Sequence, residues 1–211
     1  MSHSSTTAAT LWAATAPARL PFDAVNAPFA TDMVVIGGGV TGLSTALHLA
    51  QSGAKVCLID AFEIGHRASG RNGGQVVPGV KPGPQLLMQR FGESEAKAMM
   101  RFTYGCADET FALIDRYAID CQPTRNGWIQ GSYSKASTAY LQQRAQQINA
   151  YGGDVAFLEP DAVQAATGSV FWPSGLIEKR AGAVQPLAYV RGLARALAAL
   201  GAGVYENSPV K

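Results

Sequence analysis

Residues 33–42 read MVVIGGGVTG, an apolar run that ends in three glycines and continues into a helical pattern. This order is typical of the first strand, turn and helix of a dinucleotide-binding βαβ unit. Gly37 permits the tight turn after the strand, Gly39 lets the backbone approach a pyrophosphate, and Gly42 lets the helix pack closely on the strand. The N–H groups and the positive end of that helix would then bind the phosphate charge.

The sequence on both sides of the glycines supports this interpretation. Residues 34–36 form a continuous β-branched run, which predicts a strand buried on both faces of a parallel sheet. A second apolar run, residues 54–59, ends at Asp60, about 20 residues beyond the glycines, where a carboxylate can accept the ribose hydroxyls. We therefore expect an α/β fold with a nucleotide site; the disfavoured alternative is a similar turn that binds no nucleotide.

A second glycine-rich stretch, residues 68–75, reads ASGRNGGQ and follows soon after the acid. A simple NAD domain would pass directly from its acid into the next helix, so this additional loop suggests a larger cofactor. The Ser69 hydroxyl and the backbone amides can donate to phosphate oxygens, and Arg71 can add a charge-assisted bond. Gly73 and Gly74 would let the chain pass close to a flat ring. A flexible surface loop is the alternative interpretation.

These stretches resemble a known family. Residues 34–61, VVIGGGVTGLSTALHLAQSGAKVCLIDA, and residues 64–79, IGHRASGRNGGQVVPG, are similar to the FAD-dependent amine and amino-acid oxidoreductases of the D-amino-acid oxidase superfamily. The SGRNGGQ string and the LWAAT segment at residues 11–15 look most like the gamma-glutamylputrescine oxidoreductase group. One position departs from that group, because Arg67 stands where glycine is usual. Arg67 would be strained if the loop needed a positive φ there.

The resemblance implies a Rossmann-like FAD-binding domain of the D-amino-acid oxidase type, with the beginning of an interleaved α+β substrate domain. It implies FAD as the cofactor and places Val210 near the adenine and Gln75 and Val77 near the flavin ring. The residues that it implies in FAD binding are Gly37, Gly39, Gly42, Asp60, Ser69, Gly70, Arg71, Asn72, Gly73, Gly74, Gln75 and Val210.

The implied reaction is oxidation of a C–N bond of an amine or amino acid by hydride transfer to the flavin. The motif favours a gamma-glutamylputrescine-like substrate and a place in polyamine catabolism. A D-amino-acid dehydrogenase-like or sarcosine oxidase-like activity is the enzymatic alternative, and a truncated, inactive flavoprotein fragment is the alternative of another class. No residue has a neighbourhood in the sequence that identifies it as a catalytic acid or base.

The organisation predicted for the chain has four parts: an N-terminal arm at 1–30, the first part of the FAD domain at 31–120, a substrate-domain portion at 121–173, and a second part of the FAD domain at 174–211. The arm is either partly ordered or packed on the FAD domain. Because chains of the resembling family continue well beyond this point, we expect a fragment that is inactive alone and has an unpaired sheet edge.

Elements between the FAD loop and the end are predicted from hydrophobic patterning. Helices are expected at 84–91 and 93–117. Strands at 119–122 and 127–131 would form a hairpin that begins the substrate-domain sheet, followed by short strands at 155–158 and 169–172.

Composition restricts the remaining function classes. A formal net charge of +2 is too small to indicate nucleic-acid binding, and no apolar run approaches the roughly 20 residues of a membrane span. Three widely spaced cysteines suggest reduced thiols in a cytoplasmic protein, and the arm lacks the features of a signal peptide. His48 and His66 have no partners at metal-ligand spacing, so no metal site is expected. Nothing in the sequence predicts an oligomeric state.

Overall fold

The computed structural model describes residues 10–210, and the chain forms two compact units. Unit 1 contains the chain up to Gly74, then Leu113–Pro123, and the chain from Val184 onward. Unit 2 contains Gln75–Ala112 and Thr124–Ala183. The chain therefore passes repeatedly from one unit to the other, and the predicted α/β class with an interleaved second domain is confirmed. The functional domain boundaries given above remain predictions.

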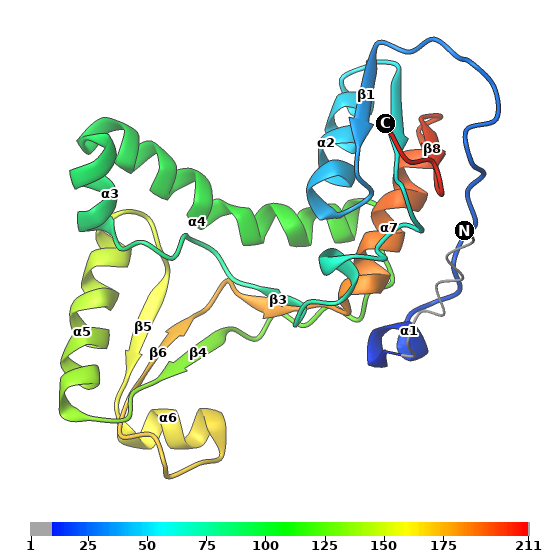
Figure 1. The fold of residues 1–211 in the computed structure, drawn as a ribbon. Coiled ribbons are helices and arrows are strands. Elements are labelled where there is room, and N and C mark those ends of the chain that lie inside the picture. Colours follow the sequence, from blue (N-terminus) through cyan, green and yellow to red (C-terminus); the bar gives the residue numbers. More distant parts are fainter. Residues whose placement is uncertain (1–9, 211) are drawn as a thin grey trace. The chain divides into compact units, whose positions relative to one another are not determined.

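Unit 1 is built on a parallel sheet with the strand order β1-β2-β8 (Figure 1). In its register, Leu58 lies beside Val35 on one side and Val204 on the other. Two helices contact the sheet and each other, so they cover the same face. The elements are β1 (Met33–Ile36), α2 (Val40–Gln51), β2 (Val56–Ile59), the 3₁₀ turn η1 (Ala68–Gly70), α7 (Pro186–Ala199) and β8 (Gly203–Tyr205).

Strand β1 lies at an edge of this sheet, where β2 is the only strand hydrogen-bonded to it among residues 10–210. Val34 is 51% exposed and Ile36 is 66% exposed. The prediction that this strand is buried on both faces is therefore wrong for this chain. The physical reason is that α2 and α7 cover one face, whereas within residues 10–210 no strand lies beside β1 at its outer edge.

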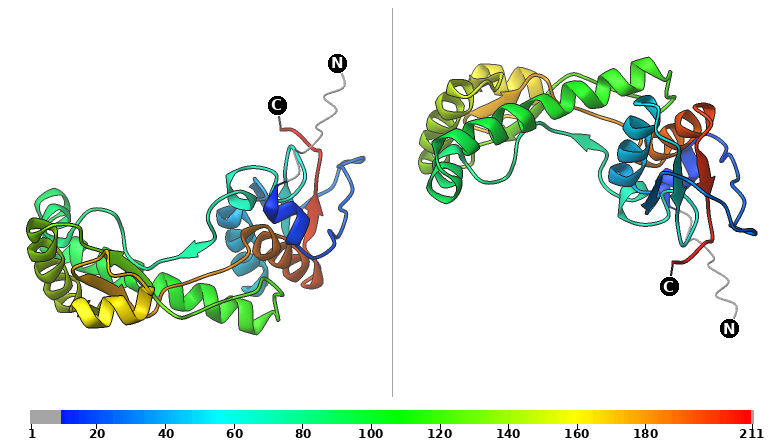
Figure 2. Two further views of the ribbon diagram at one scale, coloured as in Figure 1. Left: turned by 90° about the horizontal axis from the view of Figure 1, so that it is seen from below. Right: turned by 90° about the horizontal axis from the view of Figure 1, so that it is seen from above.

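The N-terminal segment packs on unit 1 through helix α1 (Leu11–Thr15), which contacts α7 (Figure 2). Gln185 connects the two helices. Its Nε2 donates to the carbonyl of Trp12 at 2.7 Å, while its Oε1 caps α7 by accepting from the N–H of Ala188, also at 2.7 Å. These contacts favour a packed arm over a partly ordered one. Residues 1–9 of the predicted arm lie outside the described residues.

Unit 2 contains an antiparallel sheet of order β4-β6-β5, in which Leu176 lies opposite both Gln130 and Phe157. Its core gathers around Met100, Leu141 and Leu176. The elements are α3 (Pro84–Phe91), α4 (Glu93–Arg116, in unit 2 as far as Ala112), β4 (Trp128–Gly131), α5 (Lys135–Ala150), β5 (Val155–Leu158), α6 (Pro160–Thr167) and β6 (Gly175–Glu178). A second, two-stranded sheet pairs β3 (Gln75–Val76) with β7 (Gly182–Ala183).

Two of the predicted strands are wrong. Residues 119–122 form a connection in unit 1 with Ile119 and Cys121 buried. They are not a strand, because Ala118 and Gln122 adopt left-handed φ values of 45° and 49° that interrupt an extended conformation. Strand β4 consequently pairs with β6, and the predicted hairpin does not form. Residues 169–172 form a turn stabilised by local side-chain bonds, since the N–H of Phe171 donates to the Ser169 hydroxyl at 3.2 Å.

Two of the three cysteines are buried, Cys57 in β2 and Cys121 in the connection after α4. Burial, with a smaller contribution from the neighbouring Asp120 carboxylate, raises the pKa of Cys121 to about 11. Burial also raises the pKa of Cys57. Both thiols are therefore protonated near neutral pH and behave as small core residues. None of the described helices combines the length and hydropathy needed to cross a membrane.

Candidate functional site

The turn between β1 and α2 has the geometry that the sequence predicted for its glycines. Gly37 has a φ of +110°, which side-chain-bearing residues rarely adopt, and its N–H donates to the carbonyl of Ile59 at 2.8 Å. A Cβ on Gly42 would overlap the carbonyl oxygen of Gly37, so only glycine allows the helix to lie this close to the strand. The turn is thus fixed sterically at both of these positions.

Gly39 is the N-cap residue of α2 and supplies no side-chain cap. The first N–H groups of a helix lack partners within the helix, and α2 carries no acidic residue in its first turn. The positive end of the helix is therefore not neutralised by its own side chains. A Cβ on Gly39 would lie 2.8 Å from the Ser69 hydroxyl oxygen, so this glycine lets the Ser69 loop lie close against the turn.

Ser69 connects the second glycine-rich stretch to the same helix end. Its Oγ accepts from the N–H of Val40 at 3.1 Å, which leaves the hydroxyl proton available to an acceptor such as a phosphate oxygen. The loop brings Ser69 here because it turns sharply at Gly70, where a Cβ would overlap the carbonyl oxygen of Gly65. The two motifs that the sequence singled out therefore meet at the N-terminus of α2.

Asp60 follows β2 and organises the turn from the other side. Its Oδ2 accepts from the N–H of Gly38 at 2.5 Å, and its Oδ1 accepts from the N–H of Phe62 at 2.8 Å. Each carboxylate oxygen can accept more than one hydrogen bond, so both retain capacity for the hydroxyls of a ribose. The acid therefore has a structural role in holding the glycine turn in addition to any role in binding.

Asn72 is engaged within its own loop. Its Nδ2 donates to the carbonyl of Ser69 at 3.0 Å, and its Oδ1 accepts from the N–H of Gly74 at 2.7 Å. Gly74 has a φ of +69°, and a Cβ there would overlap the carbonyl oxygen of Val184. A Cβ on Gly73, by contrast, would meet nothing within 4 Å, so the chain is open at that point. Asn72 and Gly74 shape the loop, and Gly73 leaves a surface accessible.

The two arginines of this loop behave differently. Arg67 has a φ of −91°, so the strain considered for a non-glycine residue there does not arise. Its guanidinium lies 4.2 Å from the centre of the Phe62 ring, a cation–π contact. Arg71, in contrast, has no hydrogen bond or ion pair with any side chain within residues 10–210, and it lines a cavity of about 120 Å³. Its charge is available to an anionic ligand.

For three residues that the resemblance implies in the cofactor site, the structure gives no contact with the turn between β1 and α2. Gln75 and Val77 belong to unit 2, where Gln75 pairs with Ala183 across the β3–β7 sheet. Val210 follows β8 in unit 1 and is 57% exposed. The remaining predicted residues surround the N-terminus of α2 or shape the two loops beside it.

The sequence did not indicate the importance of Glu206, which is completely buried after β8. Its Oε1 accepts from the N–H of Ile64 at 2.7 Å, and its Oε2 forms an ion pair with Arg19 of the N-terminal segment. It therefore joins the arm to the chain between Asp60 and the Ser69 loop. The signal available in the sequence was an isolated acid at the carboxyl end of a short apolar strand.

The site thus combines a glycine turn, a helix N-terminus with no acidic residue in its own first turn, a serine hydroxyl, a carboxylate and an arginine whose side chain has no partner within residues 10–210. These are groups that a dinucleotide site uses, and the side chain that lies at the helix N-terminus, Ser69, is itself a hydrogen-bonding group. Among residues 10–210, no three His, Cys, Asp or Glu side chains come together as metal ligands.

Comparisons with known proteins agree with this geometry. Residues 32–211 match the family described as "DAO: FAD dependent oxidoreductase". Gamma-glutamylputrescine oxidoreductase of Escherichia coli (strain K12) is 32% identical over 200 residues, covering 94% of this chain and 47% of that protein. Glycine oxidase of Bacillus licheniformis is 28% identical over 182 residues, covering 85% of this chain and 46% of that protein. The chain spans about half the length of the curated relatives that it matches.

Solved structures show the same fold. L-amino acid deaminase from Proteus myxofaciens matches with a TM-score of 0.73 at 19% identity, covering 90% of this chain and 41% of that one. Glycine oxidase from Bacillus cereus ATCC 14579 matches with a TM-score of 0.63 at 23% identity, covering 84% of this chain and 46% of that one.

Proposed function

Because the chain belongs to the family of FAD-dependent oxidoreductases, we propose that the protein oxidises a C–N bond of an amine or amino acid. The observation that carries this proposal is the family match over residues 32–211. The 32% identity to a gamma-glutamylputrescine oxidoreductase favours a gamma-glutamylputrescine-like substrate, polyamine catabolism and a cytoplasmic location. FAD, when bound, supplies the acceptor for the hydride that leaves the substrate carbon.

In this proposal unit 1 holds the two phosphates and the ribose of FAD. The N-terminus of α2 and the hydroxyl of Ser69 bind the pyrophosphate, and Arg71 adds a cation. Asp60 accepts the ribose hydroxyls. The other residues proposed for the FAD site are Gly37, Gly39, Gly42, Gly70, Asn72, Gly73 and Gly74, with Gln75 and Val77 near the flavin ring and Val210 near the adenine. The boundaries of the FAD-binding and substrate portions stay as predicted from the sequence.

The oxidation removes a hydride from the carbon that bears the nitrogen and leaves an imine. Water then hydrolyses the imine to an aldehyde or keto acid and releases the amine or ammonia. We assign no catalytic acid or base within residues 10–210. The contribution of this chain is therefore to bind and orient the cofactor.

A second candidate is oxidation of a small amino acid, in the manner of a D-amino-acid dehydrogenase or a sarcosine oxidase. The match to a glycine oxidase over 85% of this chain favours it. The two candidates differ in which compound reduces the flavin, gamma-glutamylputrescine or a small amino acid.

Anaerobic reduction of the flavin should decide the substrate. The complete gene product is expected to purify with bound FAD, and its visible flavin band should bleach with gamma-glutamylputrescine and more slowly with glycine or D-alanine. Bleaching by the amino acids alone would support the second candidate. A flavin that none of these compounds reduces would contradict both. We expect the 211-residue chain alone, which spans about half of its relatives, to show no bleaching.

Asp60→Ala should weaken FAD binding about 10- to 150-fold, because it removes charge-assisted hydrogen bonds worth about 1.5–3 kcal/mol. Asp60→Asn should lose less, since its amide oxygen can still accept from Gly38 or Phe62. The dissociation constant, measured by titrating apoprotein with FAD, checks both variants. Asp161→Ala, on the exposed surface of α6 in unit 2, is the matched control and should leave binding unchanged. Equal affinities for the Asp60 and Asp161 variants would show that this turn is not the cofactor site.

A further inference from the structure

Helix α4 presents an apolar surface to solvent within unit 2. One side of the helix is buried and contributes Ala96, Met100 and Tyr104 to the core of that unit. On its exposed side, Phe102 is 76% exposed and Met99 is 36% exposed. Isolated apolar side chains are ordinary on protein surfaces, whereas apolar side chains that gather on one helix face mark a contact surface. None of the residues proposed above for FAD contact lies on this helix.

The exposed side of α4 is organised in two neighbouring rows, each with a spacing of four residues. Residues at this spacing form a ridge on a helix, and the ridges of one helix pack into the grooves of another. The first row is uncharged, and the second has a charge at each end and a glycine in the middle. The rows are Ala98, Phe102 and Cys106, and Arg101, Gly105 and Glu109. We call these six residues the α4 face.

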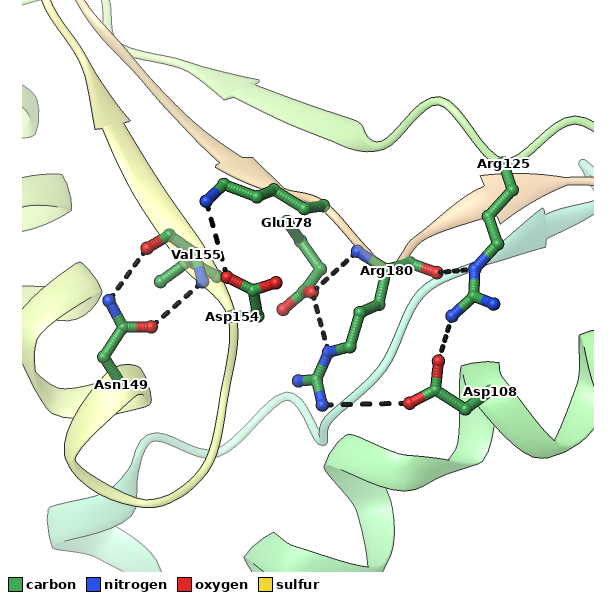
Figure 3. A network of polar contacts seen from close by, with 8 residues as sticks. Asp108, Arg125, Asn149, Asp154, Val155, Glu178 and Arg180 are labelled. Carbon is green, nitrogen blue, oxygen red and sulfur yellow. Dashed lines mark hydrogen bonds and ion pairs between the residues drawn. The ribbon is translucent and has the colours of Figure 1, made fainter.

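The two charges of the α4 face differ from the neighbouring acid on the same helix. Asp108 forms an ion pair with Arg125 inside unit 2 (Figure 3). Arg101 and Glu109, by contrast, form no ion pair with any group among residues 10–210. They stand four residues before and four residues after Gly105 and have opposite signs. The α4 face therefore carries one unpaired cation and one unpaired anion, placed symmetrically about its glycine.

From this arrangement, we propose that the α4 face binds the α4 face of a second copy of this chain, with the two helices antiparallel and crossing beside Gly105. A two-fold axis at this point places Arg101 of each copy opposite Glu109 of the other, so that two ion pairs flank the crossing. The Phe102 ring of each copy then lies against the uncharged rows between these pairs. Because each copy contributes a single helix, the interface is small, and the dimer should dissociate reversibly at micromolar concentration.

Charge complementarity is the reason for choosing a second copy as the occupant. The α4 face supplies both halves of each ion pair, as a contact between identical surfaces requires. A parallel pairing would place each Glu109 beside its equivalent, and the like charges would repel. A lipid surface would be attracted by several cations around the apolar residues, but the α4 face has one charge of each sign. This proposal does not depend on the oxidation proposed above.

Charge reversal tests this contact, with the dissociation constant of the dimer measured by analytical ultracentrifugation of the complete gene product. Arg101→Glu should weaken the dimer at least about tenfold, because it replaces both ion pairs by pairs of like charge. Glu109→Arg should have the same effect. The double variant should restore the dimer, since its charges are exchanged but remain complementary. Lys135→Glu, an exposed reversal at the start of α5 in unit 2, is the control and should leave the dimer unchanged.

A thiol crosslink reports the same contact independently. Cys106 is exposed, whereas Cys57 and Cys121 are buried, so a short bismaleimide should join two copies through Cys106. Phe102→Ser, at an exposed position, should reduce both the crosslink and the dimer, and it tests the contact even if the double variant fails to fold. A gene product that stays monomeric, a dimer that Arg101→Glu leaves unchanged, or a folded double variant that stays monomeric would each overturn the proposal. A Cys106 that does not react with maleimide would also overturn it, because the chain itself would then cover the α4 face.

Discussion

Gly42→Ala is expected to destabilise unit 1 by about 3 kcal/mol or more, at or above the upper end of the usual cost of overpacking. The added methyl group would overlap the carbonyl oxygen of Gly37, a backbone atom that cannot rotate aside. Its distance of 3.4 Å to Val35 Cγ1 is an ordinary contact, so the overlap with the Gly37 backbone is what would force α2 away from the turn. The free energy of unfolding, measured by denaturant titration, checks this value, and FAD affinity should fall with it.

Gly105→Ala is the matched control for this substitution. Gly105 lies within α4, and a Cβ there would meet nothing within 4 Å. Because glycine in a helix costs about 0.5–1 kcal/mol relative to alanine, this variant should be stabilised by a similar amount. The same chemical change is thus expected to have opposite signs at the two glycines. Similar small effects at both positions would contradict the close contact between α2 and the turn.

The turn around α2 could be predicted from the sequence because its constraints are local. A positive φ at Gly37 and the lack of space for a side chain at Gly42 are properties of one short segment. Asp60 is close enough in sequence that the length of the βαβ unit fixes its position. The contact between Ser69 and Val40 spans 29 residues, and the sequence indicated the two motifs but not this bond.

Strand pairings between distant segments could not be predicted from the sequence, because they do not depend on local constraints. Residues 119–122 have strand-like composition, but the left-handed Ala118 and Gln122 turn them into a connection. The partner of β4 is instead β6, more than forty residues further along the chain. The exposure of Ile36 likewise depends on which strands lie beside β1. A β-branched run predicts a strand, but it does not indicate which strands pair with it.

Glu206 is the clearest case of a role that only the folded chain reveals. It is separated from Arg19 by 187 positions, yet the two form an ion pair in which the Glu206 side chain is 1% exposed. The same carboxylate accepts a hydrogen bond from the N–H of Ile64 at 2.7 Å. Glu206 therefore secures both the N-terminal segment and the chain that leads from Asp60 to the Ser69 loop.

Glu206→Ala is accordingly expected to cost about 3 kcal/mol, the lower end of the usual range for breaking a buried ion pair, because Arg19 is 30% exposed and can turn toward water. Glu206→Gln should cost less, since its amide oxygen can still accept from Ile64. Both free energies of unfolding come from denaturant titration, and trypsin should cleave faster at Arg19 once its partner is gone. Glu93→Gln, which removes the carboxylate of an exposed pair with Lys97, is the control and should change neither measurement. If Glu206→Ala were as harmless as this control, the buried ion pair would not be what secures the N-terminal segment to the rest of unit 1.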